Sequence, residues 1–233
     1  MLKVDRINSY YGGAHILKDL SLQVKKHEVV ALLGRNGAGK STTMKSIMGL
    51  VPPVSGSISF EGQNISAMDT HLVCQQGIGY VPEDRRIFPD LTVEENLEVG
   101  KRSVRDGVTQ WAHDDLFDLF PNLAERRNQL GGSLSGGEQQ MLTIARTLMG
   151  NPSMILLDEP SEGIAPVIVE QLAGVIADLK AQGLAILLSE QNMHFARLVS
   201  TQTYIIEQGV IRYEGSFYDL DRKPDIWKKY LAV

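Results

Sequence analysis

The sequence predicts an α/β fold in which the buried strands of a mostly parallel sheet alternate with amphipathic helices. Three apolar segments, 28–33, 154–157 and 185–188, are typical of strands that are buried on both faces. After the first of them, apolar residues from Met44 to Met48 recur at the three- and four-residue spacing of a helix packed on a sheet. A chain of 233 residues with 43% hydrophobic residues is long enough for one large domain, or for a core with a subdomain.

Each further element has its own sequence signal. Strand-length apolar runs bounded by glycine or polar turns predict strands at 2–10, 20–24, 28–33, 56–60, 77–81, 154–157, 185–188, 204–207 and 210–213. The first two surround a Tyr-Gly-Gly turn in an antiparallel β part, and the last two form a hairpin. Helical spacing predicts helices after a glycine loop and at 93–99, 111–120, 141–149, 169–176 and near the C-terminus.

The stretch from about 84 to 134 is polar and rich in charge, unlike its surroundings. We interpret it as a helical insertion. The whole chain, 1–233, is then expected to form a single domain. Residues 1–84 and 150–233 would make up the core with its β part, and 85–149 would form a helical subdomain.

Composition excludes several classes of protein. The 23 basic and 28 acidic residues give a net charge of −5, which disfavours a protein that grips nucleic acid over its whole surface. Cys74 is the single cysteine, so no disulfide can form within the chain. The first residues lack the apolar run of a signal peptide, and no apolar stretch approaches the roughly 18 residues of a transmembrane helix. We expect a soluble protein that meets a membrane only through its surface or its partners.

A glycine-rich loop follows the strand at 28–33. Its sequence over 34–41, Gly-Arg-Asn-Gly-Ala-Gly-Lys-Ser, fits the phosphate-binding pattern G-x-x-x-x-G-K-S/T. In this pattern backbone N–H groups point at phosphate oxygens, Lys40 reaches the β- and γ-phosphates, and the Ser41 hydroxyl ligates Mg²⁺. A plain glycine turn is the alternative, but the strand–loop–helix context favours nucleotide binding. The expected nucleotide contacts are Gly34, Arg35, Asn36, Gly37, Ala38, Gly39, Lys40, Ser41 and Thr42.

Two carboxylates end the strand at 154–157. Asp158 is placed to hold Mg²⁺ directly or through water, because that ion takes a few carboxylates together with phosphate oxygens. Glu159 could orient or deprotonate the attacking water. A solvated, acidic strand end is the alternative, and the preceding phosphate-binding loop disfavours it.

A second pair of glycines occurs in Leu-Ser-Gly-Gly-Glu at 134–138. Ser135 and Glu138 have the spacing of a capping box before an apolar helix, which is a purely structural interpretation. It leaves Gly136 and Gly137 unexplained, since each costs about 1 kcal/mol relative to alanine in a helix. Bare N–H groups at a helix start also bind anions, so this segment could serve the nucleotide of another subunit.

The order of these three motifs resembles that of the nucleotide-binding subunits of ABC transporters, and the resemblance covers essentially the whole chain. It implies a P-loop ATPase fold with ATP and Mg²⁺ as ligands and ATP hydrolysis as the reaction. Tyr11 matches the aromatic residue that stacks on adenine. Ser135, Gly136 and Gly137 match the signature that contacts the γ-phosphate across a head-to-tail dimer.

Three positions depart from the superfamily pattern. Glu83 stands where a glutamine usually touches Mg²⁺, Gln191 where a switch histidine is usual, and Ala165 where an aspartate is usual. Glu83 would add a third carboxylate beside Asp158 and Glu159, and repulsion should raise at least one pKa unless Mg²⁺ or Lys40 compensates. Gln191 cannot become a cation; if this slows hydrolysis, Gln191→His should raise ATP turnover. The expected catalytic residues are Glu159, Lys40, Gln191 and Glu83, and the expected metal ligands are Ser41, Asp158 and Glu83.

Similarity to one ATPase subunit of branched-chain amino-acid importers lies at 81–96, 134–141, 156–166 and 189–192. This resemblance implies two membrane-spanning permease subunits, a second and different ATPase subunit, and a periplasmic binding protein as an indirect partner. It also implies a peripheral place on the cytoplasmic face of the inner membrane. Close relatives take urea or short amides. Arg85, Arg86 and Phe88 would lie where a groove accepts a short permease helix, with a solvated charged loop as the alternative.

Two other classes of function compete with transport. Non-transport ABC ATPases that act on ribosomes or DNA usually have two cassettes or a long coiled-coil insertion, whereas this chain has one cassette and no heptads between Lys40 and Ser135. A nucleotide kinase or GTPase would explain 34–41 but not 134–138. An importer ATPase with no nucleic-acid partner is therefore the leading interpretation.

Overall fold

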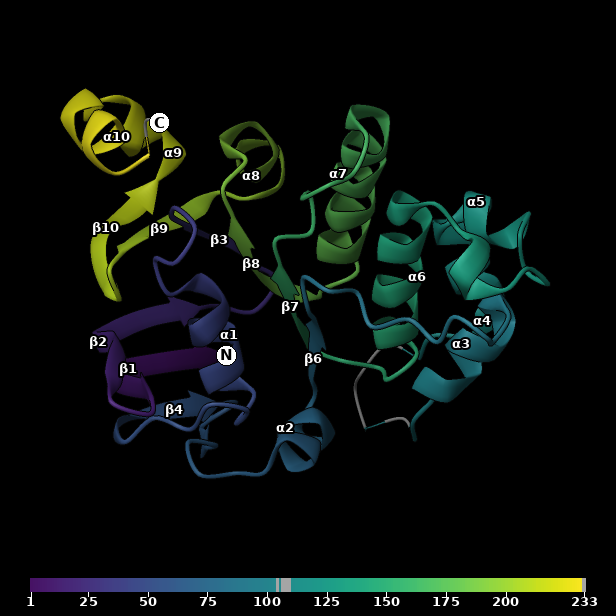
Figure 1. Cartoon of the computed structure of the whole chain (residues 1–233), viewed down its shortest axis with the longest axis horizontal. Coiled ribbons are helices and arrows are strands. Elements are labelled where there is room, and N and C mark those ends of the chain that lie inside the picture. Colours follow the sequence, from purple (N-terminus) through teal and green to yellow (C-terminus); the bar gives the residue numbers. More distant parts are fainter. Residues whose placement is uncertain (104, 106–109, 232–233) are drawn as a thin grey trace.

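The computed structural model describes residues 1–103, 105 and 110–231. It contains two sheets with helices around them (Figure 1). The larger sheet has the order β10-β9-β3-β8-β7-β6, and its neighbours pair in parallel except for the predicted hairpin of β9 and β10. Its strands are β3 (Val29–Leu33), β6 (Ile78–Val81), β7 (Met154–Asp158), β8 (Ala185–Glu190), β9 (Gln202–Glu207) and β10 (Val210–Ser216).

The N-terminal β part is a four-stranded antiparallel sheet with the order β2-β1-β4-β5. One of its strands begins earlier than expected, at Ala14 rather than at residue 20. A register shift with Asp19 at φ 48° interrupts the period-two burial pattern there, which hides the first half of the strand. The strands are β1 (Leu2–Tyr11), β2 (Ala14–Val24), β4 (Ser55–Phe60) and β5 (Gln63–Asn64).

Helices cover both faces of the larger sheet. Figure 1 shows α6, α7 and α8 on one side of it and α1 with the N-terminal sheet on the other. No helix in the described part of the chain is both long and apolar enough to cross a bilayer. The helices are α1 (Lys40–Ile47), α2 (Thr70–Gln76), α3 (Val93–Gly100), α4 (His113–Leu119), α5 (Pro121–Ala124), α6 (Gly136–Leu148), α7 (Pro166–Ala181), α8 (Met193–Val199), α9 (Phe217–Asp221) and α10 (Pro224–Tyr230).

The core consists of two hydrophobic clusters, one on each face of the larger sheet. Alternate residues of β3 contribute to different clusters: Val29, Ala31 and Leu33 to the first, and Val30 and Leu32 to the second. The first cluster continues through α6 and α7 into α3 and α4. The polar insertion therefore packs on the same core as the sheet. The second cluster joins α1 to the N-terminal sheet.

Candidate functional site

The phosphate-binding loop runs from the end of β3 to the start of α1. Gly39 has φ 114° and Gly37 has φ 76°, so both lie in the left-handed region that glycine tolerates best. A Cβ on Gly34 would lie 2.6 Å from the carbonyl oxygen of Ile206, so close packing against β9 requires glycine there. Each of the three glycines of the motif thus has a geometric reason: a positive φ at Gly37 and Gly39, and close packing at Gly34.

An open cleft of about 270 Å³ lies against this loop. Tyr11, Glu83 and Glu159 line it together with loop residues. Tyr11 ends β1 and is 46% exposed, so its ring is accessible to a ligand in the cleft. The structure therefore gathers three expected site residues from distant parts of the sequence around one cavity.

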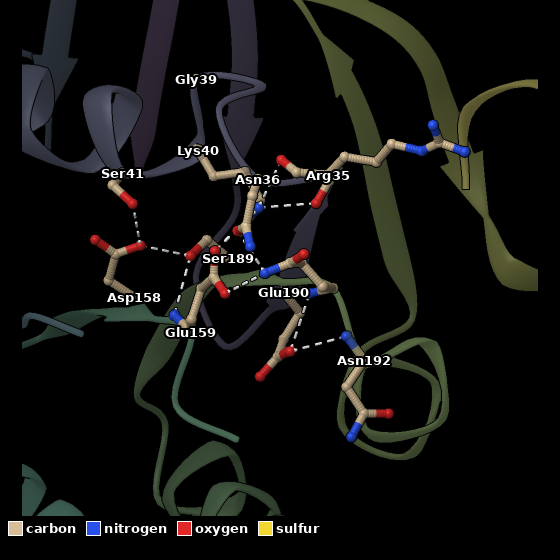
Figure 2. A network of polar contacts seen from close by, with 12 residues as sticks. Arg35, Asn36, Gly39, Lys40, Ser41, Asp158, Glu159, Ser189, Glu190 and Asn192 are labelled. Atoms are coloured by element: carbon tan, nitrogen blue, oxygen red, sulfur yellow. Dashed lines mark hydrogen bonds and ion pairs between the residues drawn. The ribbon is translucent and has the colours of Figure 1, made fainter. Parts of the chain in front are cut away.

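Lys40 is buried at the base of the cleft. Its Nζ donates to the carbonyl oxygens of Gly34 and Arg35 at 2.8 and 3.0 Å, and it forms an ion pair with Glu159 Oε1 at 3.0 Å (Figure 2). Only 3% of the Lys40 side chain and 5% of the Glu159 side chain are exposed. Removing either partner would leave a buried charge without its counterion, which is strongly unfavourable.

Three hydroxyl groups hold the buried carboxylate of Asp158. Ser41 Oγ and Ser189 Oγ donate to Oδ1 at 3.0 and 2.6 Å, and Tyr80 Oη donates to Oδ2 at 3.1 Å (Figure 2 shows the two serines). Ser189 stands opposite Asp158 in the β7–β8 register, which brings it close. Burial, followed by the charge of Asp158, raises the pKa of Tyr80, so this hydroxyl keeps its proton and remains a donor.

Glu159 has a left-handed backbone with φ 49°, which is uncommon for a residue other than glycine. Its N–H donates to the carbonyl oxygen of Ser189 at 3.1 Å and to Ser189 Oγ at 3.0 Å. Its carboxylate accepts a hydrogen bond from Gln191 Nε2 at 2.6 Å, and the same nitrogen donates to Asn36 Oδ1 at 2.7 Å. Gln191 therefore connects the carboxylate to the phosphate-binding loop.

A further carboxyl group, Glu162, shares a hydrogen bond with Glu159. That bond, then burial and the charges of Glu159, Glu83 and Glu190 raise the pKa of Glu162 to about 7. Burial would raise the pKa of Glu159, but hydrogen bonds, first from Glu162 and then from its other partners, hold that pKa below its usual value. The expected rise in pKa is therefore not found at Glu159, where Lys40 is among the groups that compensate the repulsion. It occurs at Glu162, which was not among the expected site residues.

The residues around Asp158 suit Mg²⁺. Ser41 offers a hydroxyl beside the Asp158 carboxylate, and Glu83 lines the same cleft. Among the described residues, no three His, Cys, Asp or Glu side chains converge as a metal-binding group. A partial set of oxygen ligands fits Mg²⁺, which keeps several waters and takes substrate phosphates to complete its shell.

The signature residues lie outside this cleft, at the start of α6. Ser135 is exposed; its hydroxyl accepts from the N–H of Glu138 at 3.4 Å, and Glu138 accepts from the Ser135 N–H at 2.8 Å. The expected capping box is therefore present. A Cβ on Gly137 would lie 2.8 Å from Ile168 Cγ2, so packing against α7 also favours glycine there. Internal structure accounts for this glycine, while the exposure of Ser135 leaves its hydroxyl accessible to another molecule.

Comparisons with known proteins identify the family of the chain. Residues 17–162 match the family described as ABC transporter. The chain is 41% identical to the high-affinity branched-chain amino acid transport ATP-binding protein BraG of Pseudomonas aeruginosa, over 100% of both chains. It is 36% identical to the lipopolysaccharide export system ATP-binding protein LptB of Haemophilus influenzae, over 100% of this chain and 97% of the relative. A solved nucleotide-free ATP-binding cassette from an ABC transporter matches with a TM-score of 0.83 and 26% identity, covering 97% of this chain and 95% of that one.

Proposed function

The chain belongs to the ABC transporter family as an ATPase subunit, and we propose that it powers an importer of branched-chain amino acids. The proposed cargo is supported by BraG, whose name states branched-chain amino acid transport and which is similar over its full length. LptB, which is named for lipopolysaccharide export, is similar at lower identity. The cleft would serve ATP in either system, so its geometry supports the ATPase and is neutral about the cargo.

One observation carries the proposed mechanism, namely the buried Lys40–Glu159 pair beside the phosphate-binding loop. A triphosphate on the loop would draw Lys40 toward its β- and γ-phosphates. Glu159 Oε1 would then be free to accept a proton from the attacking water, while Gln191 Nε2 holds Oε2 in place. The water oxygen bonds to the γ-phosphorus as the bond to the bridging oxygen breaks, giving ADP and phosphate.

The remaining cleft residues would bind the rest of the nucleotide. We propose that Tyr11 stacks on the adenine and that loop residues 34–42 surround the phosphates. Ser41 and Asp158 would hold Mg²⁺, with Glu83 at the rim. When bound, this ion would neutralise charge on the phosphate oxygens.

An ABC transporter ATPase works with membrane permease subunits. We propose two permeases, a periplasmic binding protein that supplies the cargo, and a peripheral position on the cytoplasmic face of the inner membrane. We also propose head-to-tail pairing with a second, different ATPase. The support for pairing is that exposed Ser135 lies outside the P-loop cleft, so its hydroxyl would complete a nucleotide site in a neighbouring chain.

We propose that a short permease helix docks in a groove of about 280 Å³ along β6. Phe88 and Val99 line it and are 44% and 54% exposed, and the Arg146 guanidinium lies 4.9 Å from the Phe88 ring centroid. Apolar side chains beside a cation fit an amphipathic helix with an acidic or polar end. The two arginines expected beside Phe88 do not line this groove: Arg85 Nη2 donates to the carbonyl oxygen of Glu162 at 3.4 Å, and Arg86 Nε lies 2.9 Å from Asp84 Oδ2.

The cargo is tested by purifying the binding protein encoded beside this chain's gene and identifying its bound small molecule. Leucine, isoleucine or valine would support the proposal. Urea or a short amide would instead assign the chain to the related importers of those compounds. The ATPase activity of the reconstituted complex should rise with the loaded binding protein. A complex that responds only to lipopolysaccharide would exclude import.

A further inference from the structure

Tyr80 of β6 lies both at the proposed nucleotide site and at the groove proposed for the permease helix. Its hydroxyl donates to Asp158 Oδ2 at 3.1 Å, in the nucleotide site. The same residue lines the groove along β6, together with Cys74, Val99 and Arg146. One residue thus contacts the expected metal carboxylate and also borders the proposed docking groove.

Strand order explains this double position. β6 is the last strand of the larger sheet (Figure 1), and within the described residues it pairs only with β7. Residues of β6 line the groove together with residues of the neighbouring segments. Ile78 and Tyr80 of β6 and Leu156 of β7 pack against the second cluster, on the α1 side. Asp158 is two residues beyond Leu156 and faces the same side because strand side chains alternate. The Tyr80 hydroxyl reaches it there.

The Tyr80 hydroxyl fixes one side of the Asp158 carboxylate. Among the described residues, the hydroxyl donors are Ser41 and Ser189 to Oδ1 and Tyr80 to Oδ2. A carboxylate held at Oδ1 alone could rotate about that end. Hydrogen bonds of this kind orient metal-ligating carboxylates and tune the affinity for the metal.

We propose that Tyr80 is a positioning residue that orients Asp158 for Mg²⁺ and links this carboxylate to the permease helix in the groove. A helix that presses on β6 would move the Tyr80 hydroxyl relative to Oδ2 and so change the affinity for Mg²⁺. The orienting role depends on the contacts of this chain alone. The link rests on the docking proposed above.

The first experiment compares Tyr80→Phe with the matched control Tyr204→Phe. Both lose a hydroxyl that is bonded to a carboxylate, since Tyr204 Oη donates to Glu214 Oε1 at 2.9 Å outside the P-loop cleft. ATP binding is measured by calorimetry while Mg²⁺ is titrated, and separately in EDTA. We expect Y80F to raise the Mg²⁺ concentration for half-saturation about tenfold and to leave binding in EDTA unchanged. Y204F should change neither, and equal Mg²⁺ dependence in wild type and Y80F would overturn the orienting role.

The second experiment fills the groove. Cys74 is the single cysteine of the chain and lines the groove, so a bulky maleimide can be attached there, with Cys74→Ser treated identically as the control. Val99→Trp fills the groove from an exposed position without any label. It therefore shows whether an effect of the maleimide comes from filling the groove or from unfolding by the label. Either change should raise the Mg²⁺ midpoint at least about threefold in wild type and add nothing in Y80F. Equal shifts in both backgrounds, or none in wild type, would overturn the link.

A third measurement separates this inference from the docking on which the link rests. Assembly with the permeases should shield Cys74 from the maleimide. If shielding fails while Y80F still weakens Mg²⁺ binding, the docking proposal falls and the orienting role stands. If shielding occurs but filling the groove leaves the Mg²⁺ midpoint unchanged, docking stands and the Tyr80 link falls.

Discussion

Glu159 has a backbone conformation that is unfavourable for its residue type, with φ 49°. Such strain costs on the order of 1–3 kcal/mol and persists only where surrounding contacts hold it. Here Ser189 accepts hydrogen bonds from the Glu159 N–H, and Lys40 and Gln191 hold the Glu159 carboxylate. The strained turn therefore directs the carboxylate into the cleft, where the proposed mechanism uses it as a base.

Glu159→Gln should separate nucleotide binding from hydrolysis, because it keeps the shape of the side chain and removes its basicity. We expect ATP turnover to fall by about two orders of magnitude or more, the usual contribution of a positioned base, while MgATP still binds. The control is Glu207→Gln, which changes a carboxylate of β9 that lies 3.6 Å from Arg212. This variant should hydrolyse ATP at the wild-type rate. Phosphate release and equilibrium binding measure both effects. Normal hydrolysis by E159Q would show that another group is the base.

Glu162 should make the stability of the protein depend on pH. Its pKa is about 7 in the folded protein and about 4.3 in an unfolded chain, so between these values the folded state binds more protons. The stability that this carboxyl contributes is complete below the unfolded pKa and is lost as the pH rises through about 7.

Glu162→Gln stays neutral and can still hydrogen-bond. Its melting temperature should therefore exceed that of wild type by a margin that grows as the pH rises from about 5 to about 8. Glu170→Gln, at an exposed position of α7, is the control and should follow the wild-type curve. Thermal melts across this range provide the measurement. A constant difference between E162Q and wild type would mean that the pKa of Glu162 is not raised.

Among the secondary-structure elements, those with strong apolar patterns are predictable from the sequence. β3, β7 and β8 are fully buried and lie within a residue or two of their expected positions. Local patterns do not predict α2, because it buries Val73 alone and has no apolar stripe. α8 did carry a signal: the Asn192 side chain caps it through the N–H of Phe195, and Phe195, Ala196 and Val199 are buried at helical spacing.

Part of the candidate site can likewise be predicted from the sequence, and part cannot. The loop at 34–41 and the carboxylates Asp158 and Glu159 stand in contiguous motifs, so the sequence predicts them. Ser189 and Tyr80 bond to Asp158 across sequence separations of 31 and 78 residues. These contacts depend on the strand order β6-β7-β8 and its register, which no local pattern specifies.

Two helices begin with the same capping box, which allows a test of the signature. Ser135 caps α6, and Thr92 caps α3 with its hydroxyl 3.2 Å from the Glu95 N–H. Ser135→Ala and Thr92→Ala should each lower the free energy of unfolding by about 1 kcal/mol. S135A alone should also reduce the ATPase activity of the assembled transporter. Denaturant unfolding and ATPase assays measure the two effects, and equal activity losses would reduce Ser135 to a helix cap.

At the scale of the whole molecule, the P-loop cleft and the signature segment, which we propose to bind different nucleotides, lie on one continuous framework. The first hydrophobic cluster joins the sheet that carries Asp158 to α6, which Ser135 begins. The P-loop cleft is lined by residues such as Lys40 and Glu159, and Ser135 is not among them. On the proposed head-to-tail pairing, such a chain would bind its own nucleotide in the P-loop cleft and contact the nucleotide of a neighbour through Ser135.

Pairing of this kind predicts that two substitutions in this chain remove different nucleotides. Glu159→Gln is combined with the matching carboxylate-to-amide change in the companion ATPase, so that hydrolysis is slow at both sites and the bound ATP should join the two chains. Lys40→Ala should then remove the nucleotide on this chain and lower the trapped ATP by about half. Ser135→Ala should release the nucleotide held by the companion, and Thr92→Ala should release neither.

Light scattering measures the association, and photo-crosslinking of labelled ATP identifies which chain holds each nucleotide. The outcome is decisive because the two variants act through different surfaces, the buried ammonium of Lys40 and the exposed hydroxyl of Ser135. If S135A released the nucleotide crosslinked to this same chain, the cap would act within one chain. Head-to-tail pairing would then be wrong, since a cap donated to a neighbour cannot loosen the nucleotide of its own P-loop.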